Sequence, residues 1–291
     1  MASGEQGPQT LHERILFGAL TALFSLLGVF LVPFFYIAPV PLGVITFRQG
    51  MGVGTVIALI SAVVTGLFIG DPLALVTVIL LLALGLALGG GLREGLRPVQ
   101  LLIVGSVVST IVLGTFFYTL LNLLGFASIG ELFDLLQELM GEQLAGQIAM
   151  LRVVYPAALI SGAVFYTFFN MWGIQRVLRA LKIDTPWFPP LRTWRLPAPW
   201  AIAFLVILAL GFAPLPAFLH AVLLNVVYGL SQVFIVTGIA VAAFYVFKWG
   251  WHPALTVGFA LFAFLVPFGN LLAAFLGLLD TGVNLRRHDE D

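Results

Sequence analysis

The sequence predicts an all-α membrane protein, a polytopic bundle of about eight to nine transmembrane segments. Of its 291 residues, 61% are hydrophobic and only 9% are charged. The charges fall at the breaks between apolar runs of about twenty residues, which is the length of helix that crosses the hydrocarbon of a bilayer. Because lipid offers no partner to an unpaired backbone group, such runs are expected to be helical. We therefore expect a multi-pass protein embedded in the lipid bilayer.

The apolar runs, taken in order, supply the membrane segments. They cover residues 15–36, 51–69, 73–91, 99–125, 153–173, 198–213, 217–247 and 254–279. The run 217–247 is long enough to bend or split near Gly229. Between the first two runs, residues 37–47 contain Pro39 and Pro41 and can form a short return crossing. These alternatives keep the expected count at about eight to nine segments.

Basic residues predict the orientation, because short loops that carry Lys and Arg stay in the cytoplasm. The middle loops place Arg93 and most other basic residues on one side. Arg14 joins this side only if residues 37–47 cross the membrane, and Arg286 joins it only if the last run turns back. The last run contains Pro267, which can break a helix. We therefore expect a return crossing near the front and a re-entrant helix at the end.

Two segments are expected outside the spans. Residues 128–147 begin with Ser128 and Glu131 in the spacing of a capping box, and leucines then recur at helical spacing opposite acidic residues. This predicts an amphipathic surface helix that either links two spans or covers an outward-facing cavity. Residues 176–199 are rich in proline and tryptophan, which is typical of a cytoplasmic linker at the membrane interface.

These segments divide the chain into parts. We expect a front helical bundle over residues 1–175, the linker over 176–199 and C-terminal helices over 200–291.

The composition argues against several classes of function. The chain has no cysteine, and its scattered histidines form no ligand cluster, so we expect no metal site and no cofactor. Its formal net charge is zero and it has no basic run, so nucleic acid is not an expected partner. No glycine-rich phosphate loop, HExxH motif or nucleophile elbow is present, so we expect no catalytic residue and no enzymatic activity.

Neutral polar residues inside the spans are the candidates for a substrate cavity. They are Thr115, Tyr118, Asn122, Tyr166, Asn170, Asn225, Tyr228, Gln232 and Asn270. Several recur at helical spacing, and an amide that faces lipid is costly, so these faces are expected to point into the bundle. Two interpretations stay open, which are hydrogen bonding between helices and a pocket for a small neutral or amphiphilic molecule.

Small residues mark faces on which another helix can pack closely. Gly18 and Ala22 lie in the first span, and Gly85 and Gly89 lie near the end of the third. Such spacing favours helix association, and the partner is either internal or another subunit.

Short motifs at both ends of the chain resemble a known family. They are Pro39-Val40-Pro41-Leu42 followed by Arg48-Gln49-Gly50, the segment Thr237-Gly238-Ile239-Ala240-Val241, and Leu276-Gly277-Leu278-Leu279-Asp280 followed by Arg286. This pattern is similar to that of the YybS-like family of uncharacterised bacterial membrane proteins. The chain departs from it where Thr237 replaces a glutamine, and where Gly282, Val283 and Leu285 replace aromatic residues.

The resemblance implies a bacterial plasma-membrane protein. The family is also distantly similar to the substrate-binding subunits of energy-coupling-factor transporters, whose six-helix bundle packs small residues of its first helix against a coupling subunit. Residues 15–175 accommodate six helices if the Pro39 stretch crosses. We therefore expect a transporter-like protein, working with another membrane protein or a separate ATPase module, since the chain has no nucleotide-binding motif. The alternative is a membrane scaffold or assembly factor similar to MreD-like proteins.

Asp280 and Arg286 allow two interpretations. They can pair if the helix unwinds at Gly282, or they can mark the point where the last helix leaves the membrane. We expect the second, because exposed ion pairs contribute only ~0 to 1 kcal/mol.

Overall fold

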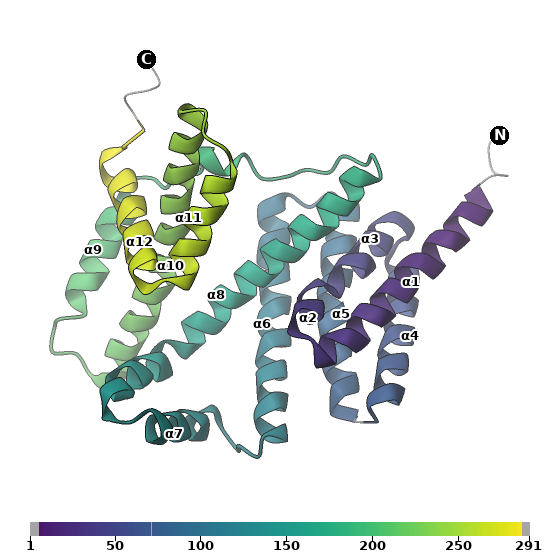
Figure 1. Ribbon diagram of the computed structural model, residues 1–291, viewed down its shortest axis with the longest axis horizontal. Coiled ribbons are helices and arrows are strands. Elements are labelled where there is room, and N and C mark those ends of the chain that lie inside the picture. The colour runs from purple at the N-terminus through teal and green to yellow at the C-terminus, as the bar shows by residue number, and fades with distance from the viewer. Residues whose placement is uncertain (1–5, 71, 287–291) are drawn as a thin grey trace. The chain divides into compact units, whose positions relative to one another are not determined.

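The computed structural model describes residues 6–70 and 72–286, and within them it contains helices and no strands. The helices are α1 Gln6–Phe30, α2 Val32–Ile37, α3 Pro39–Gln49, α4 Met51–Ile69, α5 Pro72–Arg93, α6 Pro98–Leu123, α7 Ile129–Met140, α8 Glu142–Ala180, α9 Pro199–Leu210, α10 Ala217–Lys248, α11 Ala254–Leu265 and α12 Pro267–Val283, with a 3₁₀ turn η1 at Leu191–Thr193. Figure 1 shows their order along the chain. The predicted all-α fold is confirmed.

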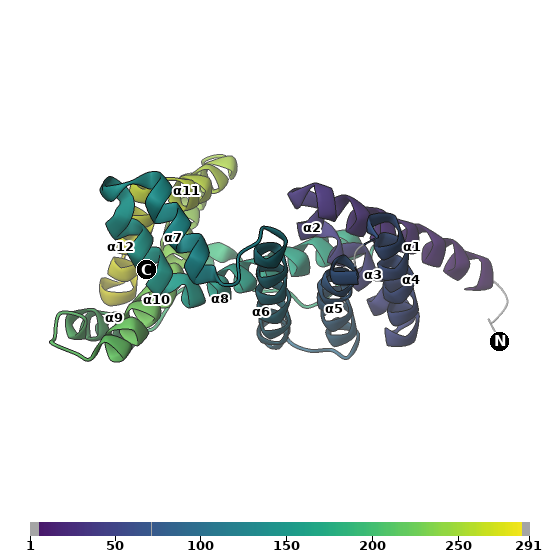
Figure 2. The same ribbon diagram turned by 90° about the horizontal axis from the view of Figure 1, so that it is seen from below.

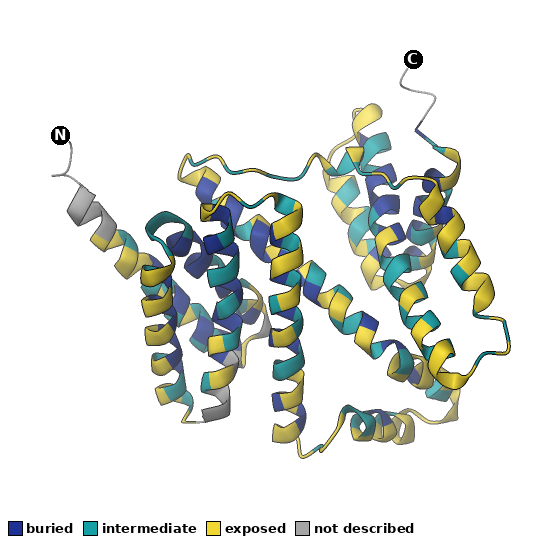
Figure 3. Cartoon of the chain, turned by 180° about the vertical axis from the view of Figure 1, so that it is seen from behind, coloured by how far each residue is buried: buried dark blue, intermediate teal, exposed yellow. Residues whose placement is uncertain are grey.

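Part of the predicted set of spans is evident in the described helices. The helices α1, α4, α6, α8 and α10 are long and apolar enough to cross a membrane, and α11 and α12 together make a sixth candidate. Large apolar side chains on them face outward, as the exposed positions in Figure 3 show, with Leu67 of α4 at 79% and Phe218 of α10 at 75% exposure. Such surfaces suit lipid rather than water. The count of eight to nine segments stays a prediction.

The chain forms two compact units. The first consists of the chain through Leu139 together with Gly162–Trp187, and the second of Met140–Ser161 with the chain from Phe188 onward. The two units therefore divide at other residues than 175 and 199. The expected division into a front bundle, a linker and C-terminal helices stays a prediction.

The first unit starts with a helical hairpin. Leu31 is extended, with φ −130°, so α1 ends there and the chain turns back into α2 and α3. The turn is tight, since a Cβ on Gly28 would lie 2.9 Å from Cα of Phe35. At the other end, Arg48 Nη2 lies 2.7 Å from Glu13 Oε1. The Pro39 stretch therefore turns back along α1 as α2 and α3, and its crossing of the membrane stays a prediction.

Small residues of α5 pack against α3. A Cβ on Gly85 would lie 2.6 Å from the carbonyl oxygen of Pro39, and a Cβ on Gly89 would overlap the carbonyl of Gly43. The partner of this predicted packing face is therefore internal. Beyond it, α4, α5 and α6 stand side by side, as Figures 1 and 2 both show.

The basic ends of these helices lie together. Arg14 Nε donates to Gln49 Oε1 at 2.5 Å, and Arg93 Nη1 donates to the carbonyl of Phe47 at 2.9 Å. The start of α1 and the end of α5 therefore share one end of the first unit, in agreement with the expected placing of Arg14.

This arrangement predicts the labelling of single cysteines, because the chain has none of its own. We expect His12→Cys and Glu94→Cys to be protected from a membrane-impermeant thiol reagent in intact cells, while Ala127→Cys, beyond the far end of α6, reacts. Opening the cells should expose the protected pair. Reaction of His12→Cys together with Ala127→Cys in intact cells would contradict the return crossing.

The second unit is built on α10, which is one continuous helix of 32 residues with no break near Gly229. It packs closely on α12, because Gly238 and Gly277 bring the two backbones together. A Cβ on Gly238 would overlap the carbonyl of Ala273, and one on Gly277 would overlap the carbonyl of Phe234. Two glycines of the family motifs therefore form a helix contact.

The last apolar run turns back on itself. Pro267 begins α12 after the extended residue Val266, and α11 and α12 meet at a bend of 114°. Tyr245, near the end of α10, donates its hydroxyl to the carbonyl of Leu285 at 2.8 Å. Both ends of the α11–α12 pair therefore lie at one end of α10, which fits the expected re-entrant helix.

The amphipathic surface helix is present as α7. The backbone N–H of Glu131 donates to Ser128 Oγ at 3.3 Å, and the N–H of Ala127 donates to Glu131 Oε2 at 2.8 Å, so the expected cap forms. The helix ends at Met140 because Gly141 takes the left-handed conformation, with φ +71°. Residues 142–147, expected in this helix, begin α8 instead.

Candidate functional site

The predicted cavity residues fall in both units. Thr115, Tyr118, Asn122, Tyr166 and Asn170 belong to the first, and Asn225, Tyr228, Gln232 and Asn270 belong to the second.

The polar face of α6 lies on the surface of the first unit. Tyr118 is 62% exposed, and the exposed Asn122 donates its amide to the carbonyl of Tyr118 at 2.7 Å. Thr115 is only partly buried. The structure therefore brings neither Tyr118 nor Asn122 together with the buried residues of α8.

Tyr166 on α8 is buried and bonds to the backbone of α2. Its hydroxyl donates to the carbonyl of Phe35 at 3.3 Å. In a helix this carbonyl would accept from the residue four positions on, which is Pro39, and proline has no N–H. The side chain of Tyr166 therefore replaces a backbone bond that Pro39 removes, as neighbouring helices do for broken membrane helices.

Aromatic rings surround Tyr166. The ring of Phe35 lies 4.7 Å from that of Phe116 and 6.1 Å from that of Tyr166, and Tyr36 meets Tyr166 edge-on at 5.3 Å between centroids. Such pairs contribute about 0.5–1.5 kcal/mol each beyond their buried area. We call Phe35, Tyr36, Phe116, Tyr166 and Asn170 the α8 cluster.

Asn170 is a polar member of the α8 cluster that has bonding capacity left. Its side chain is fully buried, and its amide nitrogen donates to the carbonyl of Tyr166 at 3.0 Å. Its Oδ1 accepts no hydrogen bond from any residue that the structure describes. A buried acceptor without a donor costs about 1–3 kcal/mol, so this oxygen is suited to receive one.

Two hydroxyls that sequence reasoning missed lie one turn from this cluster. Ser109 of α6 and Thr167 of α8 are fully buried and share a hydrogen bond of 2.8 Å. A Cβ on Gly105 would overlap the methyl group of Thr167, so the two helices approach closely. The spacing of Gly105 and Ser109, one turn apart, is the sequence signal that indicates this contact.

Asn225 bonds to the backbone next to a second proline, in the second unit. Pro156 lies inside α8. The Oδ1 atom of Asn225 accepts from the N–H of Ala157 at 3.0 Å, and its Nδ2 donates to the carbonyl of Val153 at 2.8 Å. These are the two groups that an α-helix pairs with each other. The amide of Asn225 is therefore engaged on α8 and on its own backbone at Ala221.

The other predicted residues of the second unit are half-buried. Tyr228 and Gln232 lie on α10, and Asn270 lies in the first turn of α12. No described contact joins their side chains into one site.

The most enclosed charges among the described residues of the second unit are Asp280 and Arg286, with side chains 0% and 7% exposed. Arg286 donates to Asp280 through Nε at 3.2 Å and Nη2 at 2.5 Å. It also donates to the carbonyls of Arg192 and Trp194, both at 2.7 Å. The pair therefore fastens the end of α12 to the segment around η1.

This pairing corrects the expectation that the two residues only mark the end of a helix. The helix ends at Val283, and Asn284 takes the left-handed conformation, with φ +53°. That residue reverses the chain and carries Arg286 back to Asp280. Sequence spacing alone does not show such a reversal.

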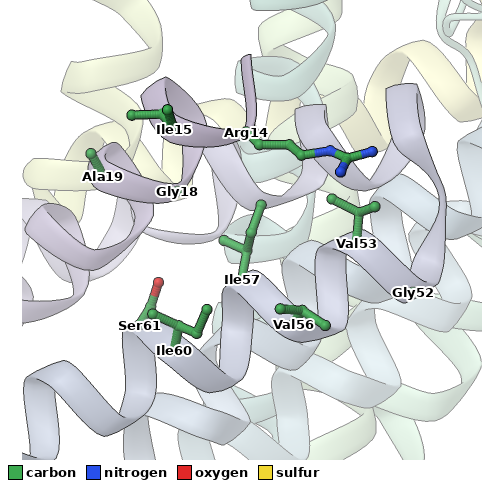
Figure 4. A pocket seen from close by; sticks show the side chains of 10 residues that line it. All are labelled: Arg14, Ile15, Gly18, Ala19, Gly52, Val53, Val56, Ile57, Ile60 and Ser61. Carbon is green, nitrogen blue, oxygen red and sulfur yellow. The ribbon is translucent and has the colours of Figure 1, made fainter. Parts of the chain in front are cut away.

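A groove of about 510 Å³ lies between α1 and α4. It is lined by Arg14, Ile15, Gly18, Ala19, Gly52, Val53, Val56, Ile57, Ile60 and Ser61, which Figure 4 shows. A Cβ on Gly18 would lie 3.8 Å from Ile57, so the predicted small-residue face of α1 lies against α4 of the same chain. Ala22, one turn further along α1, is half-buried. Packing of this face on another subunit stays a prediction.

Charged residues elsewhere form no metal centre in the described part of the chain. Across residues 6–70 and 72–286, no three His, Asp or Glu side chains gather closely enough to hold an ion.

Comparison with known proteins identifies the family of this chain. Residues 16–281 match the family described as "Predicted membrane protein (DUF2232)". The chain is also 23% identical over 308 residues to "Uncharacterized protein YybS" of Bacillus subtilis (strain 168), a match that covers 96% of this chain and 97% of the relative. No solved structure gives a significant match. The chain therefore belongs to the DUF2232 family of membrane proteins, and the expected YybS-like resemblance is confirmed.

Proposed function

We propose that this multi-pass protein is a non-enzymatic, transporter-like protein of the bacterial plasma membrane, and that its first unit binds a small neutral or amphiphilic solute. The observation that carries the proposal is the free acceptor of Asn170, which is fully buried. A donor group on a bound solute would satisfy this oxygen and so lower the free energy of the complex.

The α8 cluster suits such a solute in its other contacts. Phe35 and Phe116 offer apolar ring faces, and Tyr36, which is 42% exposed, lies at the edge of the cluster. Ligand sites typically combine apolar and aromatic walls with a few polar groups that orient the ligand. The cluster itself contains no charged side chain, which favours a neutral molecule over an ion.

Movement of a solute against its gradient would require a partner. The chain has no nucleotide-binding motif, so a separate ATPase module or another membrane protein would supply the energy. The distant similarity to substrate-binding subunits of energy-coupling-factor transporters, expected from the sequence motifs, is an analogy of fold and is itself part of this proposal.

The proposal predicts that the full chain, purified in mild detergent, retains a small molecule detectable by native mass spectrometry. Asn170→Ala should weaken retention roughly tenfold, because one hydrogen bond to a buried acceptor is lost. The matched control is Asn225→Ala, which removes an amide from the second unit. It should lower the melting temperature and leave the retained molecule in place.

A wild-type protein without any bound molecule, together with an Asn170→Ala variant that changes only the melting temperature, would contradict solute binding. That result would favour the second candidate function, a membrane scaffold. The observation that favours a scaffold is that Tyr166 and Asn225, two of the predicted cavity residues, bond to backbone groups within about one helical turn of Pro39 and Pro156. In a scaffold, all such polar groups would serve helix packing.

A further inference from the structure

The groove between α1 and α4 is separate from the α8 cluster and has the polarity of an amphiphile. Along most of its length it is lined by small or aliphatic side chains, among them Val56, Ile57 and Ile60. Arg14 is its one cationic lining residue, and its side chain reaches toward Val53 near the start of α4 (Figure 4). One end of the groove is therefore positively charged and the rest is apolar.

Among the described residues, no acidic side chain forms an ion pair with Arg14. Its Nε donates to the neutral amide oxygen of Gln49 at 2.5 Å. The nearest acidic residue along α1, Glu13, forms its ion pair with Arg48 at 2.7 Å. The first turn of α4 carries no acidic side chain. The charge of Arg14 is thus available to an anion at the mouth of the groove.

We propose that the groove holds one acyl chain of an anionic phospholipid, with its headgroup phosphate on Arg14. An arginine binds phosphate through charge-assisted hydrogen bonds, and basic residues at a membrane surface attract anionic lipids. Val56 and Ile60, two of the apolar residues that line the groove, are 56% and 57% exposed. Their side chains would contact the acyl chain. A second helix would use the apolar walls but would leave the phosphate-binding end of the groove without a partner.

The experiment uses the full chain with a single cysteine at Ile60→Cys, labelled with bimane and reconstituted in phosphatidylcholine vesicles. Quenching is compared between phosphatidylglycerol and phosphatidylcholine that are brominated at mid-chain and added in equal amounts. We expect the anionic lipid to quench about fivefold more effectively at this position. This factor is the preference for anionic lipid that the attraction of one arginine near the membrane surface provides. The matched control is Leu67→Cys at the far end of α4, which is 79% exposed and should show no preference.

Three further variants test the two ends of the groove. Arg14→Gln should abolish the preference for the anionic lipid, and Arg14→Lys should keep most of it. Gly52→Leu should reduce quenching by both lipids at Ile60→Cys, because the added side chain enters the groove from a position with open space around its Cβ. Equal quenching by both lipids in the parent protein would overturn the proposal. So would a labelled Ile60→Cys that neither lipid quenches, which indicates a protein segment in the groove.

Discussion

Replacing Asp280 with alanine is expected to destabilise the protein by about 3–5 kcal/mol, because a buried charge then loses its counter-ion. The guanidinium of Arg286 would keep its bonds to the carbonyls of Arg192 and Trp194, but it would lose the one carboxylate that contacts it among the described residues. Unfolding of the full chain in detergent, followed by tryptophan fluorescence, measures the loss. Trp194, one of six tryptophans in the chain, is in the affected segment, so part of the emission change should come early in the transition.

The control for this variant is Glu138→Ala, a carboxylate on the exposed face of α7, which should shift stability by no more than about 0.5 kcal/mol. The double variant Asp280→Asn with Arg286→Met removes both charges and should lose less stability than Asp280→Ala. An Asp280→Ala protein as stable as the Glu138→Ala protein would show that the pair does not hold the end of α12.

Replacing Gly277 with alanine should also be strongly destabilising, through overlap rather than charge. The new methyl group would overlap the carbonyl oxygen of Phe234 and lie 2.8 Å from the backbone nitrogen of Gly238. Backbone atoms cannot rotate away, so α12 must separate from α10. Overpacking of this kind costs typically about 1–3 kcal/mol and at times more. Thermal unfolding of the full chain in detergent measures the effect.

The same substitution at Gly282 provides the matched control. Gly282 lies on the same helix, and a Cβ there meets no atom within 4 Å. Alanine at this position should stabilise the protein by about 0.5–1 kcal/mol, because glycine loses more conformational freedom on folding. The two variants are thus expected to have opposite signs. A Gly277→Ala protein that is stabilised like Gly282→Ala would contradict the close contact of α10 with α12.

The backbone path could be predicted where local chemistry determines it. Pro39 and Pro267 interrupt helices because proline has no N–H to donate. Arginines near helix ends indicate which helix ends lie on the same side of the membrane. Together they were sufficient to predict the return of α2 and α3 and the reversal between α11 and α12. The end of α7 at Met140 was missed, because apolar spacing continues past Gly141 and only the backbone conformation shows the break.

The use of polar side chains could not be predicted in the same way. The sequence shows that a buried Tyr166 or Asn225 needs a partner, but it does not show which one. For Tyr166 the partner is a carbonyl 131 residues away that accepts no bond from Pro39. For Asn225 it is a turn of α8 whose regular bonding is disturbed by Pro156. The reversal at Asn284 likewise depends on one residue's conformation and not on periodicity.

The proline at position 39 also has a consequence for local opening of the first unit. Helix α2 has six residues, begins after the extended Leu31 and is followed directly by Pro39. So short a helix has few hydrogen bonds of its own, and helices of this length are unstable alone. It is held by the bond from Tyr166 to Phe35 and by its packing on α1, where the rings of Phe24 and Phe34 lie 5.7 Å apart. We expect residues 32–37 to open when these contacts to α8 and α1 are lost, while α4 and α5 remain folded.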